Sequence, residues 1–313
     1  MHLELSNFLH KKIPEFDAFL QSRPSTHYKV FKIPKRKIGF RVIAQPTPQV
    51  KAVQSQIVSF LEKKSKIHPC SMAYQKGCSI KKNALAHSNS EFILKVDLEN
   101  FFNSINPEML FTALENQSIT ISNDDKFILE ECLFWNRSKK RTSKLILSVG
   151  APSSPYLSNI VMYDFDRLIH KICINLNVNY TRYADDLTFS TKEKNVLNGI
   201  ISKIREVLKT LFSSQIIINE SKTIFSSKAH NRHVTGITLT NNNKISVGRE
   251  KRRYISALMH KFKNSLLGES DIYHLQGLFS FACHIERDFK AKMKKKYGDD
   301  VVHNLIKYGS KGN

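Results

Sequence analysis

The amino-acid sequence predicts an α+β fold in which strands and helices alternate before an all-helical, basic segment. Three observations predict it. Apolar, strand-like runs at residues 92–96 and 216–218 are separated by segments with helical spacing. After Gly248 the spacing is helical throughout. No repeat or low-complexity tract interrupts the 313 residues, which suffice for one large domain or two or three subdomains.

Charge is the unusual feature of the composition. The chain carries 49 Lys and Arg against 27 Asp and Glu, a net charge of +22. An excess that large indicates a polyanionic partner, with a solubilising surface as the alternative. No apolar run approaches the ~20 residues that span a bilayer, so we expect no membrane association. The 5 cysteines lack zinc-ligand spacing and indicate reduced thiols in a cytoplasmic protein.

The first elements follow from local patterns. Residues 29–44 alternate strand-like and basic side chains, and Pro34 and Gly39 frame a basic hairpin turn within them. From Gln49 onward the apolar residues keep helical spacing, so a helix is expected after the hairpin.

Caps and turns predict the elements that follow. The side chain of Asn106 can cap a helix that begins at the next residue, Pro107. Residues 124–135 predict another helix, and residues 150–155 form a turn that leads into a third. A helix is expected over residues 196–212 and a hairpin over residues 234–247.

Two adjacent carboxylates at a tight turn are the most informative feature of the chain. Tyr183-Ala184-Asp185-Asp186 lies between two strand-like runs, and like charges so close repel each other. Such a pair is tolerated where a divalent cation sits between the carboxylates. Asp97 ends another strand-like run, and the set suits a two-metal phosphoryl-transfer site, with cations ~3.5–4 Å apart. The alternative is a pair of turn residues in an ordinary hairpin.

These residues resemble the motifs of a reverse transcriptase and, more narrowly, of a bacterial retron reverse transcriptase. The Asp-Asp turn resembles the family's palm signature, and the matches together span about residues 29–298. The other matching segments are residues 96–105 around Asp97, 147–155, 218–223 with Lys222, 83–87 and 234–236. The last two segments point to retrons rather than to the wider family.

The resemblance implies a right-hand polymerase that copies RNA into DNA from deoxynucleoside triphosphates with two Mg²⁺ ions. It implies a cognate structured non-coding RNA as partner, priming from a guanosine 2′-hydroxyl, and a branched RNA–DNA product, msDNA. It also implies an effector protein in an anti-phage defence system, and a host RNase H that acts separately. The alternatives are a reverse transcriptase of group II intron or diversity-generating type, and a catalytically idle RNA-binding scaffold.

The resemblance also implies a division of the chain into three parts. The fingers are expected at residues 1–90 and 107–147, and the palm at residues 91–106 and 148–247. The α-helical thumb is expected at residues 248–313.

Four residues are expected to be catalytic: Asp97, Asp185, Asp186 and Lys222. The resemblance implies that Asp97 and Asp185 bridge both metal ions and that Asp186 is more peripheral. Lys222 is expected to protonate the leaving pyrophosphate or to neutralise it, with an ordinary surface lysine as the alternative.

Four residues are expected to bind the nucleotide: Arg41, Phe102, Gly150 and Tyr183. Arg41 would reach the triphosphate with Lys35, Arg36 or Lys37, because a guanidinium fork suits phosphate. By resemblance, Phe102 would exclude a ribose 2′-hydroxyl, although one ring of the Phe101-Phe102 pair is expected in the core. Gly150 would let the backbone approach the new base pair, and Tyr183 would pack near the primer end. The alternatives are a solvated basic turn for Arg41, an ordinary turn glycine for Gly150 and an ordinary strand aromatic for Tyr183.

Seven residues are expected to bind RNA: Asn83, His87, Thr235, Gly236, Lys251, Arg252 and Arg253. Asn83 and His87 lie four apart on one helical face, with local capping as the alternative. Thr235 and Gly236 fit a tight hairpin that a backbone can approach closely. The basic helical end would track a duplex backbone, with a solvated basic face as the alternative.

One segment departs from the pattern of many relatives. Ser148 and Val149 stand where those relatives carry Pro-Gln, whose glutamine is thought to hold the template–nucleotide pair. This difference is expected to affect fidelity or nucleotide affinity rather than metal chemistry.

Overall fold

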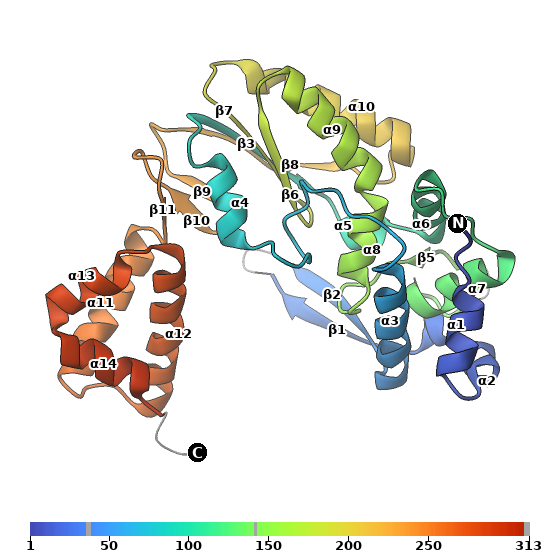
Figure 1. Ribbon diagram of the computed structural model, residues 1–313, viewed down its shortest axis with the longest axis horizontal. Helices are drawn as coiled ribbons and strands as arrows, with labels where there is room; N and C mark the ends of the chain where they lie inside the picture. The colour runs from blue at the N-terminus through green and yellow to red at the C-terminus, as the bar shows by residue number, and fades with distance from the viewer. Residues whose placement is uncertain (36–38, 141–142, 310–313) are drawn as a thin grey trace. The chain divides into compact units, whose positions relative to one another are not determined.

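The computed structural model describes residues 1–35, 39–140 and 143–309. The predicted α+β class is confirmed, because helices combine with a four-stranded sheet and smaller antiparallel sheets (Figure 1). The chain forms two compact units, residues 1–78 with 94–225 and residues 79–93 with 226–313. Of the predicted basic residues, Arg36 and Lys37 lie outside the described residues.

The first unit is built on a sheet with strand order β6-β7-β3-β8. Its strands are β6 (Asn179–Tyr183), β7 (Asp186–Thr191), β3 (Phe92–Leu98) and β8 (Ile218–Ser227). β3 occupies an inner position and is mostly buried, which explains its nearly continuous apolar sequence. β6 and β7 pair antiparallel with Tyr183 opposite Asp186, so a two-residue turn joins them.

Two long helices accompany this sheet. α9 (Tyr163–Asn175) packs on β6 and on α10 (Ile200–Phe212), and Figure 1 shows the two helices side by side. α8 (Ser154–Val161) begins after the predicted turn and leads into α9. The helix predicted over residues 196–212 starts as a short 3₁₀ turn, η2 (Val196–Gly199), and continues as α10.

Within the described residues, seven further helices complete the first unit. They are α1 (Leu5–Lys12), α2 (Phe16–Gln21), η1 (Pro24–Thr26), α3 (Pro48–Leu61), α5 (Phe101–Ser104), α6 (Pro107–Asn116) and α7 (Asn123–Leu133). The predicted cap of α6 is confirmed, because the Asn106 side chain accepts a hydrogen bond from the Met109 N–H at 3.1 Å. Ser122 caps α7 in the same way.

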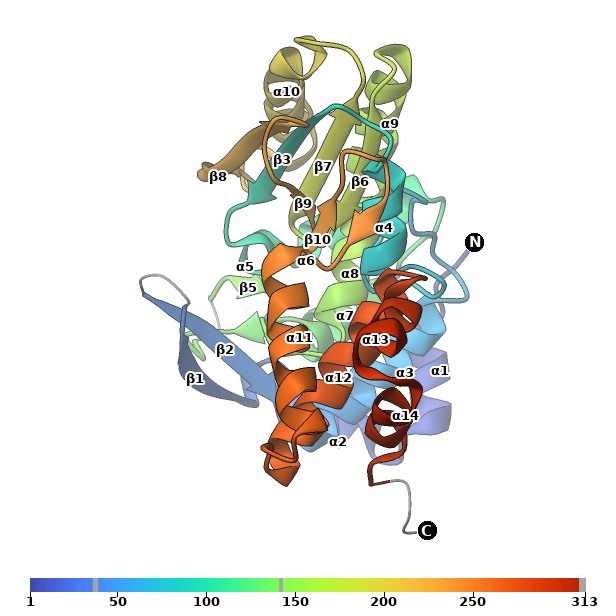
Figure 2. The ribbon, with the colours of Figure 1, turned by 90° about the vertical axis from the view of Figure 1, so that its left-hand side faces the viewer.

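Two hairpins extend the first unit. β1 (Tyr28–Pro34) pairs antiparallel with β2 (Phe40–Pro46), which confirms the predicted hairpin; Figure 2 shows it as a two-stranded ribbon. Most of its side chains are exposed. The second hairpin joins the short strands β4 (Trp135–Asn136) and β5 (Leu145–Ile146).

The second unit combines a small sheet with a helical bundle. β9 (Arg232–Val234), β10 (Ile237–Leu239) and β11 (Ile245–Ser246) form the sheet, and α4 (Ile80–His87) packs on it. The bundle comprises α11 (Arg249–Lys263), α12 (Glu269–Ile285), α13 (Phe289–Tyr297) and α14 (Asp299–Lys307), so the helical pattern predicted after Gly248 is confirmed (Figure 1).

The sheet and the bundle of the second unit share one apolar core. Residues 226–247 therefore belong to the same compact unit as the helices. The division into fingers, palm and thumb stays a prediction. Within the described ranges, no helix combines the length and the apolar character needed to cross a bilayer.

Candidate active site

The turn between β6 and β7 presents the adjacent carboxylates. Ala184 and Asp185 form the turn, and Asp186 is the first residue of β7. Ala184 is buried and has a φ of 57°, in the left-handed region that residues with a Cβ rarely adopt. The surrounding contacts maintain this strained backbone conformation, as is common in functional turns.

Asp97 lies beside this turn although it is remote in sequence. It is the penultimate residue of β3, which neighbours β7 in the sheet. The Leu98 N–H donates to the Asp185 carbonyl at 3.0 Å, so the ends of β3 and of the turn are joined directly. The structure therefore brings together the three carboxylates that the sequence singled out.

Burial and mutual repulsion raise the pKa of two of these carboxyls. Burial raises the pKa of Asp185 to about 6, and the charges of Asp186 and Asp97 add to this shift. Burial also raises the pKa of Asp186, and Asp97 contributes in the same direction. Ionising both Asp185 and Asp186 is therefore unfavourable unless positive charge lies close to them.

The chemistry of this donor set fits a divalent cation. Carboxylate oxygens are the ligands that hard divalent ions prefer, and a cation between these groups would offset their repulsion. In the described ranges, no three Asp, Glu, His or Cys side chains are already arranged to hold a metal ion. The carboxylates would therefore adjust their side-chain torsions around an ion.

Lys222 is the cationic partner of Asp97. It projects from β8, and its Nζ lies 2.7 Å from Asp97 Oδ1. The ammonium is largely exposed, whereas Asp97 is only 8% exposed. The sequence singled out Lys222 for the leaving group, and the structure brings it into the carboxylate site.

The two adjacent phenylalanines of α5 differ in burial. Phe101 is buried in the core and Phe102 is partly exposed, with the ring centroids 5.4 Å apart. Tyr183 is also partly exposed and lies near Tyr74, with ring centroids 6.5 Å apart. The roles of Phe102 and Tyr183 toward a nucleotide stay predictions.

Arg41 and Gly150 belong to the region of the basic hairpin. Arg41 is exposed on β2, opposite Ile33. Gly150 has a φ of 124°, and a Cβ there would lie 2.9 Å from Ile43 Cγ2 and 3.1 Å from the Ala44 carbonyl oxygen. The missing side chain thus lets the loop approach the hairpin, while the proposed approach to a base pair stays a prediction.

Ser148 and Val149 attach the same loop to the hairpin, a role that the sequence did not reveal. The buried Ser148 hydroxyl donates to the Ala44 carbonyl at 2.9 Å. The Ala44 N–H donates to the Val149 carbonyl at 2.9 Å. The departure from Pro-Gln therefore has a structural use, which no local pattern indicates because the partner residue lies about a hundred positions away.

The predicted RNA-binding residues of the second unit divide into buried and exposed groups. The side chains of Asn83 and His87 are fully buried on α4, where burial lowers the pKa of His87 to about 3. Asn83 Nδ2 approaches Thr235 Oγ1 at 3.5 Å, and Thr235 and Gly236 form the β9–β10 turn. Any contribution of these two buried side chains to RNA binding would therefore be indirect, and for Asn83 it would pass through its contact with Thr235.

The basic side chains at the start of α11 have different environments. Arg252 donates to both carboxylate oxygens of Glu286, at 2.8 and 3.0 Å. The Lys251 ammonium lies 4.9 Å from the centre of the Phe281 ring, and Arg253 is exposed. Their contact with RNA stays a prediction.

Comparisons with known proteins match the family and the fold of this chain. A family model described as "Reverse transcriptase (RNA-dependent DNA polymerase)" matches residues 33–239. Among solved structures, apo telomerase from Candida tropicalis aligns with a TM-score of 0.50 at 14% identity, over 90% of this chain and 62% of that chain. The molecule has the right-hand polymerase fold and is a reverse transcriptase, that is, an RNA-directed DNA polymerase.

Curated relatives show which reverse transcriptases this chain is similar to. The Retron Ec83 reverse transcriptase of Escherichia coli is 51% identical over 100% of both chains. The Retron Ec86 reverse transcriptase of Escherichia coli is 30% identical over 88% of this chain and 84% of that protein. The chain belongs to the bacterial retron reverse transcriptases, and RNA is accordingly its partner. Members of the reverse transcriptase family generally use divalent metal ions.

Proposed function

We propose that this chain synthesises DNA on an RNA template with two Mg²⁺ ions held by Asp97, Asp185 and Asp186. The observation that carries the proposal is the meeting of these carboxylates where β3 ends and its neighbour β7 begins, with the pKa of Asp185 raised to about 6. Bound Mg²⁺ would lower the pKa of the primer hydroxyl and stabilise charge on the triphosphate.

The side chains around the carboxylates would position the reactants. The Lys222 ammonium, which contacts Asp97, would donate a proton to the leaving pyrophosphate or stabilise its charge. The exposed Arg41 would bind the triphosphate with its guanidinium fork. The partly exposed Phe102 would lie beneath the sugar and exclude a 2′-hydroxyl, while Tyr183 and Gly150 would border the primer end and the new base pair.

The substrate is proposed to be a cognate structured retron RNA that serves as template and primer. Priming from a guanosine 2′-hydroxyl would produce branched msDNA, with a host RNase H acting separately on the template. An effector protein would complete an anti-phage defence system. The relatives named as retron reverse transcriptases support this proposal. The RNA would be held by the turn at Thr235 and by basic residues of α11.

Asp185→Asn tests the site assignment. The substitution preserves the shape of the side chain but removes a metal-binding charge, so DNA synthesis should fall at least about 10³-fold with RNA binding retained. Primer extension and RNA binding are measured on the same preparation. Asp125→Asn is the matched control, because Asp125 is a buried carboxylate whose partner is the Ser6 N–H, at 2.8 Å. Unchanged synthesis in Asp185→Asn would contradict the assignment.

Sequencing the nucleic acid that co-purifies with the protein tests the retron substrate. A short DNA joined to one specific RNA is the expected result. Recovery of bulk cellular RNA without a joined DNA would count against this substrate, whatever the outcome for Asp185→Asn.

A further inference from the structure

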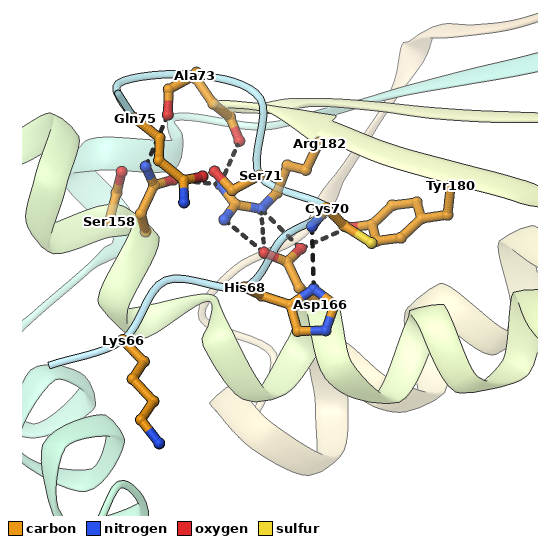
Figure 3. Close-up of polar contacts among 12 residues, drawn as sticks. Lys66, His68, Cys70, Ser71, Ala73, Gln75, Ser158, Asp166, Tyr180 and Arg182 are labelled. Atoms are coloured by element: carbon orange, nitrogen blue, oxygen red, sulfur yellow. Dashed lines mark hydrogen bonds and ion pairs between the residues drawn. The ribbon is translucent and has the colours of Figure 1, made fainter. Parts of the chain in front are cut away.

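A buried polar network that includes Arg182, Asp166 and Tyr180 (Figure 3) contacts the backbone of the turn that carries Asp185. Its centre is Arg182 on β6, which is 0% exposed and forms an ion pair with the equally buried Asp166 of α9. Arg182 Nη2 lies 2.7 Å from Asp166 Oδ2, and Nε lies 2.9 Å from Oδ1. The Tyr180 hydroxyl donates to Asp166 at 2.7 Å, so the carboxylate is well satisfied.

Asn159 of α8 extends the network on the other side of the guanidinium. Its Oδ1 accepts from Arg182 Nη1 at 3.0 Å and from the Ser71 hydroxyl at 2.9 Å. Its Nδ2 donates to the Ala73 carbonyl at 2.9 Å. Because Asn159 is itself held by Ser71 and by the Ala73 carbonyl, it keeps Arg182 Nη1 at a fixed position.

The same Nη1 group contacts the backbone of the turn. It donates to the Ala184 carbonyl at 3.2 Å. The Ala184 carbonyl and the Asp185 N–H belong to one planar peptide group, so this bond orients the peptide plane before Asp185. The Leu98 N–H orients the plane after it, because it donates to the Asp185 carbonyl at 3.0 Å. With both planes held, the direction of the Asp185 Cα–Cβ bond is set.

We propose that Arg182 and Asn159 are positioning residues that aim the Asp185 carboxylate at its metal ions. The inference rests on the proposed function of Asp185. Removing groups that hydrogen-bond to metal ligands commonly changes metal affinity or activity about 10–100-fold, because these groups orient the ligands. A contribution to fold stability alone would lower the unfolding temperature without altering metal dependence.

Arg182→Lys distinguishes a role in positioning Asp185 from a role in fold stability alone. Lysine keeps a positive charge beside Asp166 but lacks the planar fork that reaches Asp166, Asn159 and the Ala184 carbonyl together. The Mg²⁺ concentration for half-maximal synthesis should rise about tenfold and kcat should fall about 10–100-fold, with KM for the nucleotide unchanged. Hydrogen exchange in peptides that cover the 182–187 turn should be faster, and this readout does not depend on activity.

Arg232→Lys is the matched control. Arg232 is also buried, and it donates to the carbonyls of Ser90 and Thr240 within the second unit. Its substitution should lower the unfolding temperature and leave the Mg²⁺ midpoint and exchange at the turn unchanged.

Asn159→Ala is a second test variant, because it keeps the ion pair between Arg182 and Asp166. It should shift the Mg²⁺ midpoint in the same direction as Arg182→Lys and by less. If Arg182→Lys does not fold, the result for Asn159→Ala decides between the two roles.

Wild-type Mg²⁺ dependence, kcat and exchange in the folded Arg182→Lys or Asn159→Ala protein would overturn the inference. That result leaves the proposed function intact as long as Asp185→Asn abolishes synthesis. If Asp185→Asn retains synthesis, the proposed function fails instead, so the two failures are distinguishable.

Discussion

The residues of the candidate active site differ mainly in how their charges are balanced. Asp97 has Lys222 as a direct partner, at 2.7 Å, whereas Asp185 faces the charges of Asp186 and Asp97 in a partly buried position. Burial, together with these charges, raises the pKa of Asp185 to about 6, while Lys222 acts to lower it. A bound divalent cation would favour the ionised form of this carboxyl, since opposite charge nearby lowers a carboxyl pKa.

Phe102 gives a prediction about nucleotide selection. Phe102→Ala removes a partly exposed ring and should reduce discrimination against ribonucleotides about tenfold or more, with little loss of stability. Single-nucleotide incorporation with matched deoxy- and ribonucleotides measures this ratio. Phe101→Ala is the contrasting variant, because Phe101 is 3% exposed and its loss should destabilise the fold by about 3–5 kcal/mol. Unchanged discrimination in Phe102→Ala would contradict the proposal that Phe102 excludes the ribose 2′-hydroxyl.

At the scale of elements, the hairpin β1–β2 depends on the loop that precedes α8. The loop forms two hydrogen bonds with Ala44 and approaches Ile43 at a position where it has no side chain. A hairpin with few buried residues of its own needs such contacts to keep one position.

Gly150→Ala tests this attachment. Its Cβ would approach the Ala44 backbone oxygen to 3.1 Å, and the φ of 124° is strained for alanine, so we expect about 2–4 kcal/mol of destabilisation and faster proteolysis in the hairpin. Gly77→Ala is the control for backbone strain alone, because Gly77 has a φ of 79° with no neighbour within 4 Å of its Cβ. Equal unfolding free energies for both variants would contradict a role for crowding.

Stability against acid is a property of the whole molecule to which a single buried residue contributes. Burial lowers the pKa of His87 from 6.5 to about 3, so between these values the unfolded chain binds a proton that the folded chain does not. Folding stability must therefore fall as pH decreases below 6.5. The contribution of His87 at pH 5 amounts to about 2 kcal/mol.

His87→Gln should remove this contribution. Urea unfolding at pH 7 and pH 5 measures the loss of stability for each protein, and the loss should be about 2 kcal/mol smaller in the variant. An equal loss in both proteins would show that His87 is protonated equally in the folded and unfolded states.

Local patterns were sufficient for much of the fold. The hairpin at residues 29–44, the cap at Asn106 and the basic helices after Gly248 were predicted from sequence and are present. These features depend on neighbours within a few residues, which is why a linear reading finds them. The motif around Asp185 was likewise visible as a short sequence.

The sequence by itself determined the carboxylate motifs, the excess of positive charge and several elements, among them the hairpin of residues 29–44 and the basic helices after Gly248. Only the tertiary structure decided that Arg182 pairs with Asp166 beside the turn that carries Asp185, that Ser148 holds the hairpin, and that Asn83 and His87 are buried. The physical reason is that burial and hydrogen-bond partners depend on which distant segments pack together. A polar side chain in the sequence carries no sign of whether it will face solvent or an equally buried partner.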